Sequence, residues 1–453
     1  MAKKPTSFAP QEGKQTLAFN MKVDVLIYGG SAGCVDKDTE FFNGTMWKNI
    51  SDYTSEDCVL QFDPVNNRAS LVKDNVVFHK YPAETLTLIE TRAVNQCLSD
   101  EHKVLYYNEN GSYHVQPFSV IKERHNKSKT KGFTGKFKTT FNYSGEGLDM
   151  TEGELRLQVA VMADGRVVLE GKDNYTQMRF AKERKYNRLI ELCQKSQLKF
   201  DDRGFKESDK YLSGKAFEVI VWPKYKDKIF DSKYYKCSNE QLRIIIDEIG
   251  YWDGCFADNQ STKTIRYSTN HKANADFIQF AAASCGYNTS ISKDNRADKY
   301  STGEHFTVNI YETGNGFKGI ANKDGKVEFK EYKTLDGYKY CFTVPTGFFV
   351  MRRKGKIAVT GNSGKSRLLL LKALAHAYND PYFEGVIFRR TSPPLRAAGG
   401  LFSEAKKLYS SLNPHVREKD MEILFKNTKG GNIKFTHLEL ENSAENNHQG
   451  LTY

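Results

Sequence analysis

The chain has 453 residues, of which 39 % are hydrophobic, and it carries a formal net charge of +12. This length predicts about three domains, and the positive charge favours a polyanionic partner, most simply nucleic acid. No apolar run approaches the roughly 18 residues of a membrane span, and the first residues lead into a polar stretch. These features exclude a membrane-spanning or secreted class, so we expect a cytoplasmic protein with no membrane partner.

A phosphate-binding loop stands in two halves that are far apart in the chain. A strand predicted at residues 23–28 leads into a glycine-rich turn at 29–33, which stops before the Gly-Lys-Ser that such a loop requires. The missing half, Ser-Gly-Lys-Ser at 363–366, directly precedes a helix predicted at 367–378. Joining the two halves would complete the G-x-x-x-x-G-K-[ST] pattern.

The joined loop would bind ATP together with Mg²⁺. Its glycines, Gly30, Gly33 and Gly364, would let backbone N–H groups approach the phosphates at the start of a helix. Lys365 would then lie on the β- and γ-phosphates, and Ser366 would bind the magnesium ion.

The block between the two halves, residues 34–362, has the ends that protein splicing needs. It begins with Cys34 and ends with Asn362, and Ser363 follows it. The thiol can attack the preceding carbonyl to form a thioester, and the hydroxyl can then take over the N-terminal segment. Asn362 can release the block by attacking its own backbone carbonyl. The sequence therefore predicts autocatalytic excision without a cofactor, with proximity supplying much of the rate.

The block resembles the intein family over its whole length. Residues 34–44 look like the family's N-terminal block, and Ser-Asp-Glu-His at 99–102 stands where a second block usually reads Thr-x-x-His. The resemblance implies an all-β, horseshoe-like Hint splicing domain. It also implies that His102 protonates or distorts the scissile amide nitrogen and that Ser99 supports it by hydrogen bonding.

The C-terminal part of this resemblance lies at residues 340–344 and 355–362. Cys341 stands where the family has an Asp or Cys that helps to couple the steps. Gly361 replaces the His that usually precedes the terminal Asn, and a second common His near Thr346 is absent. We therefore expect either slow splicing or another group that substitutes for these histidines.

Each of these residues also has an ordinary interpretation. Taken alone, Cys34 would be a small buried hydrophobe, Asn362 a turn residue and His102 a structural side chain. Their coincidence with the broken loop favours splicing. All eight cysteines lie in the block and none forms a C-x-x-C pair, so we expect free thiols, because oxidation of Cys34 would block the reaction.

A lysine-rich run at residues 122–138 is either a solvated linker or part of a nucleic-acid surface. An internal repeat follows it. Two helix-like runs, 157–165 and 246–254, both end in Asp-Gly, and a capping box precedes each of them, at 151–154 and at 238–241. The residues after the two runs also match, with Arg, an aromatic residue, Lys and Asn recurring in the same order.

The repeat resembles the two-motif LAGLIDADG homing endonucleases over residues 126–322. That family packs its two motif helices at the centre of an α+β core built of αββαββα repeats. The resemblance implies that Asp164 and Asp253 are catalytic and bind Mg²⁺ at the scissile phosphates of double-stranded DNA. The strands would contact the major groove, and the Tyr- and Lys-rich stretch at 224–236 could add contacts. The alternatives are that each Asp-Gly is an ordinary helix stop, or that the insert binds DNA without cutting it.

The flanks, residues 1–33 and 363–453, describe a host protein. Strands are predicted at 385–389 and 432–440, with a helix at 401–412 between them. Three short stretches, Phe-Arg-Arg-Thr at 388–391, Gly-Gly-Leu-Phe at 399–402 and Gln-Gly-Leu at 449–451, look like the ATPase domain of phage terminase large subunits. This resemblance implies an infected bacterial cell, with phage DNA and the packaging machinery as partners after splicing. Because that family's Walker B strand and nuclease domain are missing, we expect this chain alone not to hydrolyse ATP.

We therefore predict a multidomain chain. An all-β Hint splicing domain would comprise residues 34–125 and 323–362, an α+β endonuclease would comprise 126–322, and a split α/β P-loop ATPase fragment would occupy the flanks. The alternative is a P-loop DNA-packaging ATPase fragment with an insertion that binds DNA and does not splice.

Overall fold

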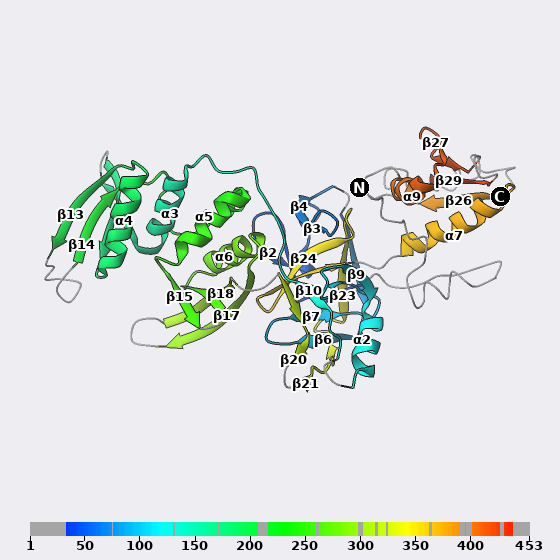
Figure 1. The fold of residues 1–453 in the computed structure, drawn as a ribbon, viewed down its shortest axis with the longest axis horizontal. Coiled ribbons are helices and arrows are strands. Elements are labelled where there is room, and N and C mark those ends of the chain that lie inside the picture. Colours follow the sequence, from blue (N-terminus) through cyan, green and yellow to red (C-terminus); the bar gives the residue numbers. More distant parts are fainter. Residues whose placement is uncertain are drawn as a thin grey trace.

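The computed structural model describes residues 33–437 with internal gaps at 75, 130–131, 171–172, 207–215, 260–261, 298–301, 313–315, 323–324, 362–364, 390–394, 396–400 and 426–429. The described chain is mostly β, with several sheets and some helices (Figure 1). We divide it into a β module (residues 33–138 and 317–361), a repeat module (139–316) and a C-terminal module (365–437).

The β module contains one large sheet and several smaller ones. The large sheet holds β1 (Glu40–Phe42), β2 (Trp47–Asn49), β3 (Val59–Asp63), β4 (Arg68–Val72), β8 (Lys103–Tyr107), β9 (Tyr113–Pro117), β10 (Lys136–Lys138), β19 (Phe317–Gly319), β24 (Phe348–Arg353) and β25 (Lys356–Gly361). The smaller sheets hold β5 (Val77–Pro82), β6 (Thr85–Glu90), β7 (Asn95–Leu98), β20 (Ala321–Asn322), β21 (Gly325–Lys326), β22 (Lys330–Lys333) and β23 (Tyr338–Thr343). Two helical segments, η1 (Ile50–Asp52) and α2 (Phe118–Lys127), complete the module.

Strands from the two ends of the block pair with each other in this module. The large sheet runs β19-β10-β8-β25-β24-β1-β2, so that β24 and β25, near the end of the block, lie between β1 and β8, near its beginning. The core beneath this sheet contains the rings of Phe41, Phe342 and Phe349. The centroid of the Phe342 ring lies 5.0 Å from that of Phe41 and 5.4 Å from that of Phe349. The first and last parts of the block therefore fold as one unit. Strands β10 and β19, which we had expected in the endonuclease segment, pair at the edge of this sheet.

The first part of the lysine-rich run at 122–138 is a helix, so the linker interpretation is wrong there. Helix α2 buries Phe118, Ile121 and His125, because residues three and four apart share one face of a helix. Lys138 in β10 is also buried, which lowers the pKa of its ammonium group to about 8. The packing of the β module therefore holds Lys138, whereas Lys127 and Lys136 are exposed.

The repeat module contains two copies of one αββαββ unit. The first consists of α3 (Glu152–Asp164), β11 (Gly165–Glu170), β12 (Asp173–Phe180), α4 (Glu183–Lys195), β13 (Phe200–Lys206) and β14 (Ala216–Val221). The second consists of α5 (Asn239–Ile249), β15 (Gly254–Asn259), β16 (Thr262–Thr269), α6 (Lys272–Ser284), β17 (Asn288–Ala297) and β18 (Thr302–Tyr311), and η2 (Ser232–Lys236) lies between the units. The sheet orders β11-β12-β14-β13 and β15-β16-β18-β17 are equivalent, which confirms the predicted duplication.

Both predicted capping boxes are present. The Thr151 side chain accepts a hydrogen bond from the backbone N–H of Glu154, and the Ser238 side chain accepts one from that of Gln241. Each N3 side chain also reaches back to the N-cap backbone, which satisfies donors that the helix leaves unpaired. These caps fix where α3 and α5 begin, and with them the register of the two helices.

The two helices end differently. Helix α3 runs through Asp164 as predicted, whereas α5 ends at Ile249, so the expectation that it would reach Asp253 is wrong. Beyond the helix, the N–H of Tyr251 bonds to the carbonyl of Glu248 at 3.1 Å. This tight turn replaces the α-helical pattern and carries the chain to Asp253.

The repeat module is docked onto the β module through an apolar contact. The ring of Phe42 in β1 lies 4.5 Å from that of Phe280 in α6 and 4.8 Å from that of Tyr235, measured between centroids. Ile291 in β17 also donates its N–H to the carbonyl of Gly355, in the turn between β24 and β25, at 3.0 Å. The two modules thus share one continuous buried cluster.

A buried arginine reinforces this docking. Arg352 in β24 is 2 % exposed, and its guanidinium donates to Glu40 in β1 at 2.6 Å and to Asp276 in α6 at 2.6 Å. The same guanidinium lies 4.6 Å from the Trp47 ring. Two carboxylates from different modules therefore compensate one buried cation.

The C-terminal module is a small α/β unit. It consists of α7 (Lys365–Asn379), β26 (Glu384–Arg389), α9 (Leu401–Tyr409), η3 (Ser410–Leu412), β27 (His415–Arg417), β28 (Glu422–Leu424) and β29 (Asn432–His437). Its sheet runs β26-β29-β28-β27, with β26 and β29 parallel. The predicted helices and strands after residue 366 are confirmed as far as His437, and residues 438–440 of the last predicted strand lie outside the described residues. The strand predicted at 23–28 lies outside the described residues.

All eight cysteines are free thiols in the structure, as predicted. Among the described residues, no helix combines the length and the apolar character that a membrane crossing would need.

Replacing Asp276 with alanine should lower the free energy of unfolding, because Arg352 would stay buried with one carboxylate partner fewer. Removing one partner of a buried pair costs about 3–5 kcal/mol, and we expect the lower end because Glu40 remains. Urea unfolding followed by tryptophan fluorescence would measure the loss, in a Cys34→Ala chain that cannot form a thioester.

The matched control is Glu304→Ala, which breaks the exposed ion pair with Lys293. That substitution should cost less than about 1 kcal/mol. Equal losses in the two variants would contradict the role assigned to Asp276.

Candidate functional site

The segment that carries Cys34 is held between two strands of the β module. The backbone of Val35 exchanges two hydrogen bonds of 2.8 Å with Tyr340 in β23, and Val35 also forms a bridge with Leu98 in β7. Cys34 donates its N–H to the Ser99 hydroxyl at 2.9 Å and accepts the N–H of Ser99 at its carbonyl at 3.0 Å. The peptide groups on both sides of the Cys34 α-carbon are therefore fixed.

Gly33 packs directly on the backbone of the segment that carries His102. A β-carbon at position 33 would lie 2.4 Å from the His102 α-carbon and 2.9 Å from the Glu101 carbonyl oxygen. Real side chains do not approach backbone atoms so closely, so only glycine fits. The peptide bond between Gly33 and Cys34 consequently lies against the His102 segment.

His102 is fully buried, and its ring bonds to Thr360 in β25. The Nε2 atom contacts the Thr360 hydroxyl, and Nδ1 has no hydrogen-bond partner among the described residues. Burial lowers the pKa of His102 to about 3, although the backbone of Gly33 and Cys34 acts in the opposite direction. The imidazole is therefore neutral at pH 7 and can act as a hydrogen-bond donor through one nitrogen.

Cys341 lies on the other side of the same site. It is buried in β23 and packs against Cys34 and Tyr81. Of the residues that the sequence predicted for splicing, Cys34, Ser99, His102 and Cys341 thus lie together.

The C-terminal end of the block approaches the same place. Gly361 ends β25, where it lies opposite Phe348 in β24 and Lys103 in β8. Lys103 directly follows His102 in the chain, and Thr360 directly precedes Gly361. Asn362, Ser363 and Gly364 lie outside the described residues.

Two residues at this site were missed by sequence reasoning. Arg353 is 2 % exposed and donates to Asp36, two residues after Cys34, at 2.7 Å. Thr360 contacts His102 from a strand 258 positions away in the chain. Arg353 belongs to no recognisable local motif, and Thr360 lies in the block at 355–362 without anything in the sequence that marks it as a contact of His102.

The phosphate-binding loop is not described as a unit. Gly30 and Gly364 lie outside the described residues, and only Gly33 of the predicted glycines lies within them. Lys365 and Ser366 begin α7, and the positions of their side chains are not described. Their predicted role in binding ATP and Mg²⁺ stays a prediction.

A second site lies where the two repeat units meet. Asp164 ends α3, and Asp253 follows α5 through the turn described above. Burial raises the pKa of Asp253, and the negative charge of Asp164 acts in the same direction. Lys185 in α4 pairs with Asp164, and Lys228 donates to the carbonyl of Val161 in α3 at 2.8 Å. Both lysines act on Asp253 in the direction that lowers its pKa.

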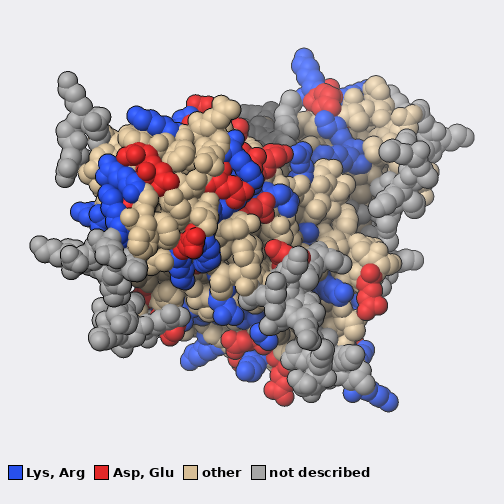
Figure 2. All heavy atoms as spheres, turned by 60° about the vertical axis from the view of Figure 1, so that its left-hand side comes forward, with Lys and Arg blue, Asp and Glu red and all other residues tan. Residues whose placement is uncertain are grey.

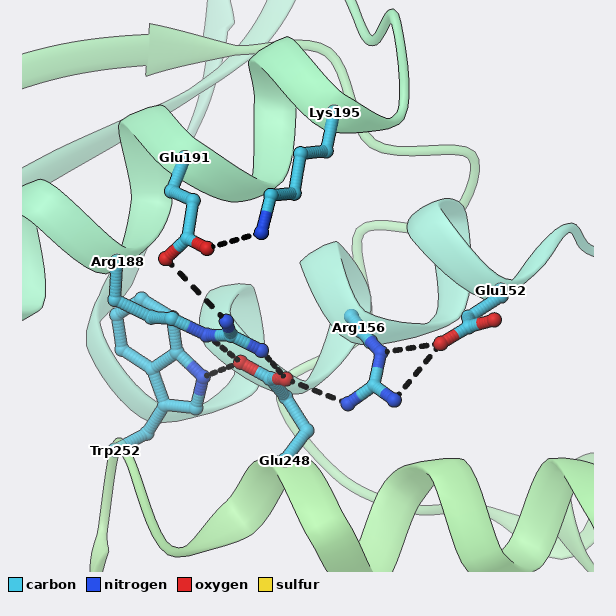
Figure 3. Close-up of polar contacts among 7 residues, drawn as sticks. All are labelled: Glu152, Arg156, Arg188, Glu191, Lys195, Glu248 and Trp252. Carbon is cyan, nitrogen blue, oxygen red and sulfur yellow. Dashed lines mark hydrogen bonds and ion pairs between the residues drawn. The ribbon is translucent and has the colours of Figure 1, made fainter.

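A buried glutamate joins the helices that carry this site. Figure 3 shows Glu248 of α5 facing the guanidinium groups of Arg156 in α3 and Arg188 in α4, with the Trp252 indole beside it. Glu248 is fully buried, accepts from Arg156 at 2.9 Å and accepts from Trp252 Nε1 at 2.9 Å. Because every partner of this carboxylate comes from a different turn or helix, it fixes how α3, α4 and α5 lie against one another.

The carboxylates at the second site suit a hard divalent cation. Mg²⁺ is commonly held by one or two carboxylates together with water and substrate phosphates. Asp164 and Asp253 supply two such groups, which interact electrostatically. The described residues contain no group of three or more His, Cys, Asp or Glu side chains that could hold a metal ion. A cation at the second site would therefore need water or substrate oxygens as further ligands.

Two tyrosines expected to contact DNA are buried. Tyr234 is fully buried and donates to Asp227 at 2.9 Å, and Tyr235 is 4 % exposed at the contact between the modules. The expectation that they add contacts to DNA is therefore wrong, because their rings complete the core. On the face that Figure 2 shows, Lys and Arg side chains are interspersed with Asp and Glu, so the net positive charge is not gathered into one patch there.

Comparisons with known proteins give limited similarity. No protein-family model matches the chain. The chain is 24 % identical over 218 residues to the ribonucleoside-diphosphate reductase subunit beta of Aquifex aeolicus (strain VF5), which covers 46 % of this chain and 30 % of that protein. The chain thus matches less than a third of that subunit's length.

Two solved structures of the homing endonuclease I-DmoI are similar to part of the chain. One describes mesophilic variants and the other a complex with DNA and Ca, at 13 % and 14 % identity. Each covers 35 % of this chain and 82 % of the other, with a TM-score of 0.24. At that TM-score, neither structure bears on the fold assigned here.

Burial of His102 in its neutral form predicts a loss of stability as the pH falls. Its pKa is about 3 in the folded chain against 6.5 for a free ring, so between these values only the unfolded chain takes up the proton. Between pH 6.5 and pH 5 this ring should cost up to about 2 kcal/mol of folding free energy. The free energy of unfolding of a His102→Gln chain should therefore fall less from pH 7 to pH 5 than that of the chain that keeps His102. Both chains would be measured in the Cys34→Ala background.

The control is His415→Gln, which changes an exposed ring in β27. It should leave the pH dependence close to that of the parent chain. A pH dependence of His102→Gln equal to that of the parent would show that the ring is accessible to protons in the folded state.

Proposed function

We propose that residues 34–362 excise themselves from the chain and join the flanking segments. The observation that carries this proposal is the position of the Gly33–Cys34 peptide bond against His102, whose ring also contacts Thr360 near the other end of the block. This arrangement supports a common centre for the two cleavage steps. The proposal places that centre in an all-β splicing domain of the Hint type.

The first step would form a thioester. The Cys34 Sγ attacks the carbonyl carbon of Gly33, the C–N bond breaks, and the proton lost by the thiol balances the one gained by the departing nitrogen. Ser99 holds the backbone of Cys34 through two hydrogen bonds, which limits the movement of the attacking residue. The neutral ring of His102 acts on the departing nitrogen as a hydrogen-bond donor.

The later steps would use residues on the C-terminal side. The Ser363 hydroxyl takes the N-terminal segment from the thioester as an ester, and Asn362 then cyclises and cuts the chain before Ser363. Cys341, which packs against Cys34, would influence the sulfur during this exchange. The ester finally rearranges to an amide, and no cofactor is consumed.

Mass spectrometry of the chain expressed under reducing conditions tests this proposal. The expected result is two products, the free block 34–362 and the joined flanks, in place of the intact chain. Cys34→Ala and Asn362→Ala should each prevent the formation of the joined product, because each removes a group whose bond changes are required.

Cys58→Ala is the matched control, since it removes a thiol of the same module that lies outside the site. It should splice like the parent chain. An intact parent chain under reducing conditions would count against splicing and favour the alternative, a P-loop ATPase fragment whose insertion does not splice and binds DNA.

We further propose that the repeat module is a site-specific endonuclease for double-stranded DNA. The observation that favours it is that Asp164 and Asp253, one from each repeat unit, interact electrostatically, with Lys185 paired to Asp164 and Lys228 acting on both carboxylates. When bound there, Mg²⁺ would activate water and stabilise the leaving oxygen. Asp164 and Asp253 would hold it, and the lysines would attract the phosphate backbone.

Incubation of the excised block with Mg²⁺ and a host gene that lacks the insert tests the endonuclease proposal. A double-strand break is expected at the uninterrupted P-loop coding site. Asp164→Asn and Asp253→Asn should each abolish cleavage while leaving binding to the DNA in place.

Asp63→Asn is the matched control, because this carboxylate ends β3 of the β module and lies outside the repeat module. It should cut like the parent. Binding without cutting by the unsubstituted block would instead identify a DNA-binding insert without nuclease activity.

The joined flanks would rebuild the phosphate-binding loop of a terminase-like ATPase. This part of the proposal rests on the completed sequence pattern and on the α/β character of the C-terminal module. Lys365 and Ser366 would bind ATP and Mg²⁺ there, with phage DNA and the packaging machinery as partners.

A further inference from the structure

Thr360 is placed to control the protonation of His102. It is 1 % exposed and lies in β25 opposite Phe349 of β24, so its backbone is fixed by the sheet. Its hydroxyl contacts Nε2 of His102, which leaves Nδ1 as the ring nitrogen without a partner among the described residues. The two ring nitrogens are therefore in different surroundings.

The neutral ring carries one proton, which can be on either nitrogen. A hydroxyl can donate or accept a hydrogen bond, so the contact with Thr360 is compatible with both tautomers. The functional consequences differ. If Nε2 carries the proton, Nδ1 is a bare acceptor and cannot donate to the departing nitrogen of Cys34; if Nδ1 carries it, Nδ1 can donate.

We infer that Thr360 is a positioning residue that donates its hydroxyl proton to Nε2 of His102 and thereby holds the Nδ1–H tautomer. This inference rests on the proposed splicing activity. In general, the hydrogen bond that one ring nitrogen of a histidine makes decides whether the proton lies on the other nitrogen. Thr360 acts on the reaction through His102.

The inference links the two ends of the block. Thr360 precedes the C-terminal junction by two residues, and His102 acts at the N-terminal junction. A chain in which β25 is not seated in the sheet would lack the hydroxyl that orients His102, so thioester formation would be slow until the C-terminal strand is in place. Premature cleavage of the N-terminal segment would thereby be limited.

Cleavage at the first junction by an added thiol, in an Asn362→Ala chain that cannot complete splicing, tests the inference. Thr360→Val, which keeps the shape and removes the hydroxyl, should slow this cleavage by about tenfold or more, which is part of the roughly 10²–10⁴-fold that a positioned proton donor contributes. Thr360→Ser retains the hydroxyl and should restore most of the rate.

The matched control is Thr343→Val. Thr343 also contacts a histidine, with its hydroxyl 2.9 Å from His79 Nε2, but at the exposed end of β23. Its substitution should leave the cleavage rate unchanged. A Thr360→Val chain that cleaves as fast as the parent would overturn the inference.

The tautomer can be measured whether or not the chain splices. Ring ¹⁵N resonances of His102, assigned with a His102→Gln variant in the Cys34→Ala, Asn362→Ala background, should report Nδ1–H with Thr or Ser at position 360 and a mixture with Val. An Nε2–H tautomer in the unsubstituted chain would refute the inference. No cleavage in any variant, combined with the Nδ1–H tautomer, would instead reject the splicing proposal and leave the positioning role standing.

Discussion

The antiparallel pairing of Val35 with Tyr340 is the contact on which the candidate splice site depends. It fixes the backbone one residue after Cys34, and Ser99 fixes Cys34 itself. Without that pairing, Cys34 would be held only by Ser99 and by the bridge between Val35 and Leu98. The same pairing ties the start of the block to a strand near its end, so the site can exist only after most of the β module has folded. Contacts of such long sequence separation form late, because loop closure must come first.

Two clusters of buried charges select one packing arrangement of the helices and modules, and they add little to the free energy of folding. Arg352 with its two carboxylates, and Glu248 with its two arginines, all lose hydration when they are buried. Replacement of such groups by well-packed apolar residues is often neutral or stabilising, whereas removal of one partner is costly. We therefore interpret them as groups that select one arrangement: Glu248 for the helices of the repeat module, and Arg352 for the contact between modules.

Local features of the fold could be predicted from the sequence, and long-range ones could not. The capping boxes at Thr151 and Ser238 were correct because a cap is decided within four residues. The end of α5 was wrong because the Trp252 indole turns back to donate to Glu248, whose carboxylate is held by Arg156 and Arg188 from two other helices, and these tertiary pairs leave no local signal. The tyrosines of η2 were misread because a Lys- and Tyr-rich stretch looks the same whether its rings lie in a core or face solvent.

The candidate site divides in the same way. Cys34, Ser99 and His102 could be named from short motifs, and the structure brings them together. Thr360 and Arg353 could not be named, because their importance comes from strand pairing between positions hundreds of residues apart. The chemistry of Asn362 and the phosphate-binding loop stays a prediction, since Asn362, Gly30 and Gly364 lie outside the described residues and the side chains of Lys365 and Ser366 are not described.

The docking of α6 on β24 has a consequence for how such a chain could evolve. Phe280 and Asp276, which hold the repeat module in place, are different residues from Asp164 and Asp253, which would cut DNA. Mutation of the carboxylates could therefore abolish cleavage and leave the contact between the modules intact. Deletion of the whole repeat module would instead expose Phe42 and remove one counterion of Arg352. A lineage that no longer benefits from DNA cleavage would find point mutation an easier route than deletion, and the silent module would persist as scaffold.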